Sequence, residues 1–154
     1  MYNLHHKTTG PRERWSNVTS DFEFDQKIKV VCWRLRGEIT EDLFVEGLKL
    51  CADIFADTKP TGGIIDFSQV TSFRVPVNVI KRVADSAPVV PSLLIRVIVA
   101  PSDHVFGIGR MFSVLSQDTR SNTHVVRTMD EAYELLKIKE PEFKALGLRR
   151  KLGS

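Results

Sequence analysis

The sequence lacks the features that define several classes of protein. Its 154 residues include two cysteines, Cys32 and Cys51. Both lie in apolar strand-like or helix-like patterns, so we expect two reduced core residues and no disulfide. No apolar run approaches the roughly 18 residues of a membrane span, and residues 1–20 lack the apolar segment of a secretory signal. These absences predict a cytoplasmic protein.

Catalytic and metal-binding patterns are also missing. His5 and His6 adjoin near the amino terminus, while His104 and His124 are isolated, so the histidines have no metal-site spacing. No Ser-His-Asp or Cys-His set can be assembled from the sequence. We therefore expect no metal or cofactor, and the sequence favours a non-enzymatic protein.

The net charge of +3 comes entirely from the end of the chain, because residues 141–154 carry +3 and residues 1–140 are neutral. A neutral domain lacks the charge of a nucleic-acid binder. The tail has the composition of a short amphipathic helix, which we expect to be solvated or docked on its own domain. The alternative is peripheral membrane contact through its cations, which are Lys144, Arg149, Arg150 and Lys151.

Strand and helix patterns alternate along the remaining chain. The predicted elements are strands 22–25 and 28–35, a helix between Thr40 and Pro60, strand 62–68, a helix opened by Pro76, strand 93–100, a helix capped by Ser102 or Asp103, strand 123–129, and a helix with a Thr128–Glu131 capping box. This order predicts an α/β fold with a mixed, mostly parallel five-stranded sheet, about four helices and an N-terminal β-hairpin at the edge. We expect a loosely ordered segment at 1–20, one domain at 21–140 and a basic tail at 141–154.

Four stretches occur in an order that resembles a known family. They are "GEIT", "GGIIDFSQVTSF", "RVIVAPSDHVFGIGRMFSVL" and "VVRTMDEAYELL". In this succession the chain resembles the STAS superfamily, in its stage II sporulation protein AA-like branch. The resemblance implies a STAS-like regulatory or binding module that takes a protein partner or a small apolar or anionic ligand, with homodimerisation as an option.

Anti-sigma antagonists of that superfamily carry an Asp-Ser-Ser-Gly motif after the central strand, and a partner kinase phosphorylates its serine. Residues 74–77 of this chain, Arg-Val-Pro-Val, stand at that place, so the resemblance does not extend to the phosphorylation switch. Ser68, Thr71 and Ser72 lie nearby, and we expect their hydroxyls to form local turns. Phosphorylation of Ser72, close to Arg74, stays open as an alternative.

Two groups of residues remain as candidates for ligand binding. One follows the central strand, and the other lies at a turn where open α/β sheets bind ligands. The candidates are Asp66, Ser68, Ser72 and Arg74 in the first group and Ser102, His104 and Arg110 in the second. The alternative function is a small hydrolase or transferase that uses Asp66 and the 102–110 turn.

Overall fold

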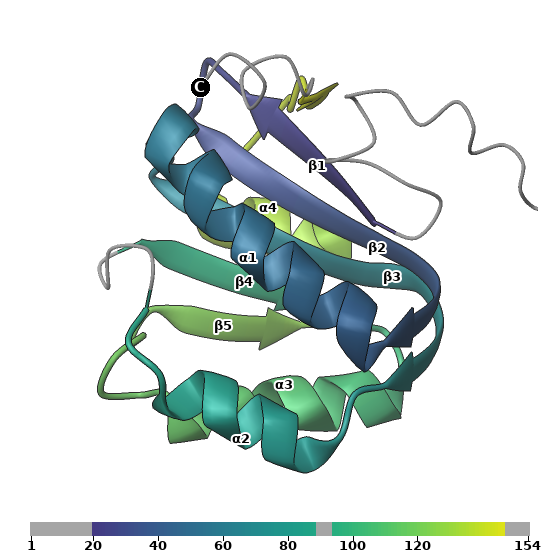
Figure 1. The fold of residues 1–154 in the computed structure, drawn as a ribbon. Coiled ribbons are helices and arrows are strands. Elements are labelled where there is room, and N and C mark those ends of the chain that lie inside the picture. Colours follow the sequence, from purple (N-terminus) through teal and green to yellow (C-terminus); the bar gives the residue numbers. More distant parts are fainter. Residues whose placement is uncertain (1–19, 89–93, 147–154) are drawn as a thin grey trace, which may run out of the picture.

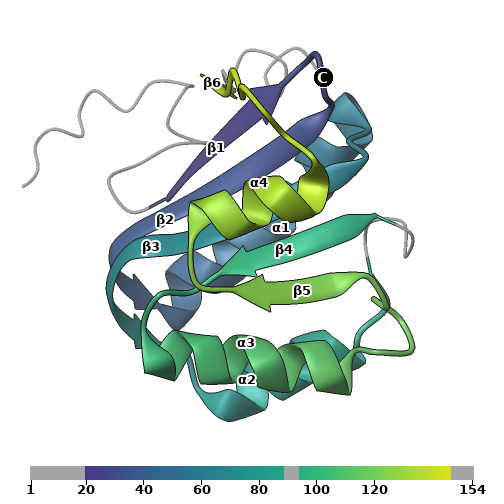
Figure 2. The ribbon, with the colours of Figure 1, turned by 180° about the vertical axis from the view of Figure 1, so that it is seen from behind.

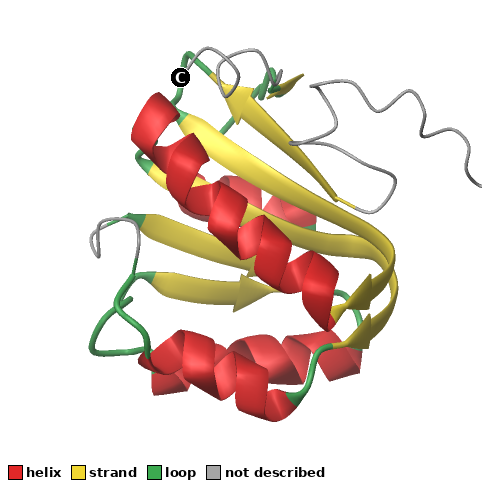
Figure 3. Ribbon diagram, viewed as in Figure 1, coloured by secondary structure: helices red, strands yellow, loops and turns green. Residues whose placement is uncertain are grey.

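The computed structural model describes residues 20–88 and 94–146, which form a six-stranded sheet with helices on both faces (Figures 1 and 3). In chain order the elements are β1 (Ser20–Asp25), β2 (Val30–Thr40), α1 (Glu41–Thr58), β3 (Gly62–Arg74), α2 (Val77–Asp85), β4 (Ile95–Val99), α3 (Asp103–Leu115), β5 (Thr123–Val126), α4 (Met129–Leu136) and β6 (Lys144–Ala145). The predicted α/β class is confirmed. The predictions for residues 1–19, Arg149, Arg150 and Lys151 lie outside the described residues.

The strands lie in the order β5-β4-β3-β2-β1-β6. Strands β2 to β5 are parallel to one another, and β1 is antiparallel to both β2 and β6. The prediction of five strands with the hairpin at the edge is therefore wrong in detail, because β6 pairs along the outer side of β1. Residues 144–145 form this strand instead of the start of a helix, since the edge of β1 offers unpaired backbone groups.

The two central strands are longer than predicted. Strand β3 continues to Arg74, and β2 continues beside it to Thr40, so the segment predicted as a loop after residue 68 is a strand. The pairing shifts register twice, between Arg34 and Arg36 and between Gly37 and Glu38. Such irregularities interrupt the period-two pattern from which a strand is recognised. The two strands bend together at their carboxyl ends (Figure 1).

Helices α1, α2 and α3 cover one face of the sheet, and α4 covers the other (Figures 1 and 2). The first face is centred on Trp33, whose ring stacks between Phe22 and Phe44 at centroid distances of 5.4 and 5.8 Å. Its indole nitrogen donates to Ser20 Oγ at 2.8 Å. The opposite face packs strand residues such as Cys32 against α4. Strands β2, β3 and β4 thus have apolar side chains packed on both faces of the sheet.

The helix N-termini predicted from capping residues and proline are confirmed. Thr40 and Ser102 are the N-caps of α1 and α3, and Pro76 directly precedes α2. The capping box of α4 is complete, because Thr128 and Glu131 exchange side-chain and backbone hydrogen bonds. These contacts fix where each helix leaves the sheet.

Candidate functional site

The predicted site residue Asp66 is part of a buried ionic network on the α4 face. Its side chain is 3% exposed, and its carboxylate accepts hydrogen bonds from Arg34 Nη1 at 2.7 Å and from the Ser68 backbone N–H at 2.9 Å. Arg34 Nε in turn donates to Glu23 at 2.9 Å. The network therefore joins β1, β2 and β3 across the sheet, which gives Asp66 a structural role.

Aromatic rings close this network from outside. The guanidinium of Arg34 lies 5.9 Å from the ring centre of Phe143, which stacks on Tyr133 at 6.5 Å. Burial raises the pKa of the Tyr133 hydroxyl and of the Cys32 thiol above their usual values. Both groups therefore stay protonated at neutral pH, and Cys32 is a core residue, as predicted.

Ser72 and Arg74 lie further along β3, opposite the end of β2. Arg74 Nη1 pairs with Glu38 Oε2 at 2.6 Å, but the two side chains are 68% and 51% exposed. An ion pair that open to water contributes little to stability. Ser68 is exposed and Ser72 is half-buried, so neither hydroxyl lies in an enclosed site.

The second predicted group, Ser102, His104 and Arg110, belongs to α3. Ser102 Oγ accepts from the Val105 backbone N–H at 3.3 Å, which is the capping role weighed from sequence. His104 is exposed, and the Arg110 guanidinium lies 6.0 Å from the ring centre of Phe106. Asp66 faces α4 while α3 packs on the other face. The structure therefore does not bring Asp66 together with the 102–110 turn.

An apolar cavity that the sequence did not predict lies between α1 and the neighbouring helices α2 and α3. Its volume is about 240 Å³, and its floor is formed by β2 and β3. A smaller cavity of about 70 Å³ continues from it and shares Leu48, Ile65, Val83 and Phe112 as lining. We call the larger space the interhelix pocket. Ligand sites are typically concave and mostly apolar with a few polar groups, and this pocket has that character.

Two arginines supply the charge of the interhelix pocket, Arg96 from the start of β4 and Arg120 from the segment before β5. Arg120 is 8% exposed, donates to Ala84 O and Thr119 Oγ1 at 3.2 Å each, and lies 5.5 Å from the ring centre of Phe112. Within residues 20–88 and 94–146, no salt bridge joins Arg120 to a carboxylate.

The two arginines oppose each other electrostatically. Burial, and then the positive charge of Arg120, lowers the pKa of Arg96 to about 10. Burial also lowers the pKa of Arg120. An anion bound between the two groups would relieve both effects. The arrangement is therefore suited to a ligand with an apolar body and a negatively charged head.

Cys51 also lines the interhelix pocket. Burial raises the pKa of its thiol to about 12, and no disulfide engages it. Residue Cys51 is half-buried, whereas Cys32 is fully buried, so the two cysteines differ in exposure. The raised pKa leaves little Cys51 thiolate at neutral pH, so reaction at Cys51 can report on the pocket only under alkaline conditions.

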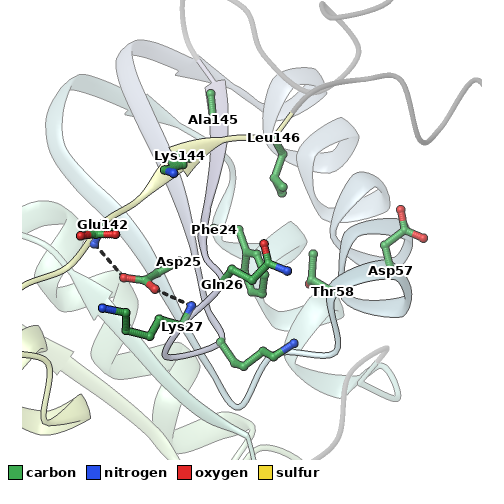
Figure 4. Close-up of a pocket in the computed structure, with 11 residues that line it drawn as sticks. Phe24, Asp25, Gln26, Lys27, Asp57, Thr58, Glu142, Lys144, Ala145 and Leu146 are labelled. Atoms are coloured by element: carbon green, nitrogen blue, oxygen red, sulfur yellow. Dashed lines mark hydrogen bonds between the residues drawn. The ribbon is translucent and has the colours of Figure 1, made fainter.

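A second depression, of about 610 Å³, lies where the hairpin turn, the end of α1 and β6 meet (Figure 4). It is polar, with Lys27, Asp57 and Glu142 among its lining residues. Asp25 in its wall is 3% exposed and accepts backbone hydrogen bonds from Lys27, Ile28 and Glu142 at 2.9, 3.2 and 2.7 Å. That carboxylate therefore fastens the tail to the hairpin turn.

Comparison with known proteins does not assign this chain to a family. No protein-family model matches the chain, and a comparison with curated proteins gives no match. In the part of the chain that the structure describes, no helix is long and apolar enough to cross a membrane. No group of three or more His, Cys, Asp or Glu side chains suited to a metal ion occurs among these residues either.

Proposed function

We propose that this chain is a non-enzymatic, STAS-like binding module whose interhelix pocket takes a small amphipathic anion. The ligand class is a short aliphatic chain with one carboxylate or a comparable head group. The proposed location is the cytoplasm, on the sequence grounds given above. The observation that carries the proposal is the pair of half-buried and buried arginines at one end of an apolar cavity.

The proposed apolar chain of the ligand is based on the apolar side chains that line the cavity. Side chains of α1, α2 and α3 line it, including Leu48, Phe55, Val83 and Phe112. Burying a methylene group against such a wall contributes about 0.8 kcal/mol. The volume of about 240 Å³ is slightly below the ~300–1,000 Å³ of sites for drug-sized ligands. A chain of about eight carbons is therefore a suitable probe.

The proposed negative head group of the ligand is based on the positive charges of Arg96 and Arg120. A carboxylate beside Arg96 and Arg120 would form charge-assisted hydrogen bonds, which are stronger than neutral ones. An ammonium group of the same size would add a third positive charge to the site. The pocket should therefore discriminate by the sign of the head group and not only by the length of the chain.

The test uses Cys51 on the folded 154-residue chain at alkaline pH, where more of the thiol is ionised. We expect octanoate to slow the reaction of Cys51 with a thiol reagent, and octylammonium and octanol to have much weaker effects. A Cys51→Ser variant identifies the signal from Cys51. Arg96→Gln and Arg120→Gln should each weaken the octanoate effect roughly tenfold or more, since each removes a charge-assisted contact. Arg82→Gln, on the exposed side of α2, should leave it unchanged.

Two results would contradict the proposal. Equal protection by octanoate and octylammonium would show that the arginines do not select an anion. Protection that is unchanged in both arginine variants would show that the ligand binds elsewhere.

A further inference from the structure

Three residues that are not glycine have a left-handed backbone in the described part of the chain, and all three are lysines. Their φ angles are 60° for Lys29, 47° for Lys59 and 58° for Lys137. A residue with a Cβ atom avoids this conformation, and glycine or asparagine is usual there. Each of these positions therefore holds a positive charge where glycine would fit the backbone better. Lys59 and Lys137 are also the C-caps of α1 and α4, where the helix dipole favours a cation.

These lysines lie at one end of the molecule, where the parallel strands begin. Lys29 directly precedes β2, and its carbonyl accepts from the Thr61 N–H at 2.8 Å, two residues after Lys59. Lys137 caps α4, and the preceding Leu136 packs against Gly62 at the start of β3. We call residues 26–29, 57–61 and 137–146 the basic end.

Exposed cations outnumber exposed acids at the basic end. Figure 4 shows part of it, with Lys27 in the turn between β1 and β2 and Lys144 on β6. The exposed lysines are Lys27, Lys29, Lys59, Lys137, Lys139 and Lys144, and the exposed acids are Asp57, Glu140 and Glu142. Asp25 is also present, but it is buried and bound to three backbone N–H groups.

We propose that the basic end docks the protein on an anionic membrane surface. The lysines project from three separate turns and act as point charges, which suits a broad sheet of anionic head groups better than a single shaped phosphate site. The structure thus extends the sequence-based alternative from the tail to the folded domain.

The position of the interhelix pocket is consistent with this orientation. Arg96 is the second residue of β4 and pairs with Gly63, which is the second residue of β3. The charged part of the pocket therefore lies at the same end of the sheet as the lysines. Membrane docking does not depend on the pocket, however, and the two proposals can fail separately.

The test is a triple variant, Lys29→Gly with Lys59→Gly and Lys137→Gly, because glycine fits the left-handed backbone and the fold should survive. The 154-residue chain is sedimented with vesicles of equal parts phosphatidylglycerol and phosphatidylcholine. A lysine near an anionic surface strengthens binding about fivefold, so the variant should bind roughly 100-fold more weakly. Its thermal midpoint should equal or exceed that of the unchanged protein. The corresponding asparagine triple variant, which also tolerates this backbone, should give the same result.

A matched control removes three positive charges from other surfaces. Lys49→Gln, Lys81→Gln and Arg82→Gln change exposed residues of α1 and α2, and this variant should bind nearly as well as the unchanged protein. Equal loss in both triple variants would overturn the proposal, because net charge alone would then explain binding. Equal sedimentation with pure phosphatidylcholine, or tighter binding to a single-stranded RNA than to the vesicles, would overturn it as well.

Discussion

Gly47 controls how closely α1 approaches the sheet, and replacing it by alanine should destabilise the protein. A Cβ atom at this position would clash with Cζ2 of Trp33 and lie 2.8 and 2.9 Å from Cη2 and Cε2 of the same ring, well inside the roughly 3.5–4.0 Å of an ordinary carbon contact. The indole cannot move aside easily, because it is 2% exposed, stacks between Phe22 and Phe44, and donates a hydrogen bond to Ser20. The helix would therefore have to shift away from β2.

Two opposing effects set the size of the change. Alanine is better than glycine in a helix interior by about 1 kcal/mol, whereas overpacking a core typically costs about 1–3 kcal/mol. The contact at Gly47 is with three atoms of a rigid ring, so we place the steric cost at the upper end. We expect Gly47→Ala to lower the free energy of unfolding by about 1–2 kcal/mol.

The other helical glycines provide a graded control. An added Cβ at Gly107 in α3 meets nothing within 4 Å, so Gly107→Ala should raise the free energy of unfolding by about 1 kcal/mol. At Gly109 the nearest atom is Val125 Cγ1 at 3.1 Å, and the effect should lie between the two. Urea titrations of all three variants measure the order. If Gly47→Ala were as stabilising as Gly107→Ala, the close packing of α1 on Trp33 would be refuted.

Three further changes probe the ionic network, the tail and a helix cap. Asp66→Leu should lower the free energy of unfolding by about 2–4 kcal/mol, because it leaves Arg34 with one carboxylate fewer. Adding Arg34→Met to this variant should recover part of the loss. Equal losses in the single and double variants would contradict this coupling. Burial alone would raise the pKa of Asp25, but the N–H groups of Glu142, Ile28 and Lys27 outweigh it, so the pKa lies below its usual 3.8. The stability that these hydrogen bonds contribute is present above pH 3.8 and is lost as the pH falls through the pKa of the folded state. Asp25→Asn should therefore flatten the decline of the urea midpoint below about pH 4. An unchanged decline would contradict this role of Asp25. Thr128→Ala should cost about 1 kcal/mol of unfolding free energy by removing the acceptor for the Glu131 N–H, and an unchanged thermal midpoint would show that the box is dispensable.

The sequence predicted those parts of the fold that depend on neighbouring residues. The caps at Thr40, Ser102 and Thr128 are examples, because a hydroxyl and the first turn of its own helix are enough to form each of them. The apolar runs identified β4 and the first half of β3 for the same reason. The predicted final strand, 123–129, is shorter in the structure and ends at Val126, because the cap of α4 begins at Thr128.

The second half of β3 shows why other parts could not be predicted. Ser68, Thr71 and Ser72 have turn-forming side chains, but pairing with β2 and the burial of Phe67 and Phe73 determine the structure. Strand β6 is an extreme case, because two residues pair only where the tail meets β1. Both outcomes depend on segments that are distant in sequence, and local patterns do not contain that information.

The candidate pocket was missed for a related reason. Arg96 did give a signal, since it interrupts an otherwise apolar strand, and a charge within such a strand invites the search for a partner or a ligand. Arg120 gave none, because it lies in a polar connection between α3 and β5. Only the fold places the second arginine beside the first and the apolar walls of α1 and α2 around them.

The two faces of the sheet hold their arginines in different surroundings, and the surroundings of Arg96 and Arg120 are the basis of the proposed ligand site. On the α4 face, Arg34 is matched by Glu23 and Asp66, so its charge is compensated within the fold. On the other face, burial and then the positive charge of Arg120 lower the pKa of Arg96. Both arginines line an apolar cavity. Arg96 also donates to Leu94 O at 3.3 Å, and Arg120 donates to Ala84 O and Thr119 Oγ1. The reason for proposing an anionic ligand is therefore the position of two neighbouring cations beside an apolar cavity.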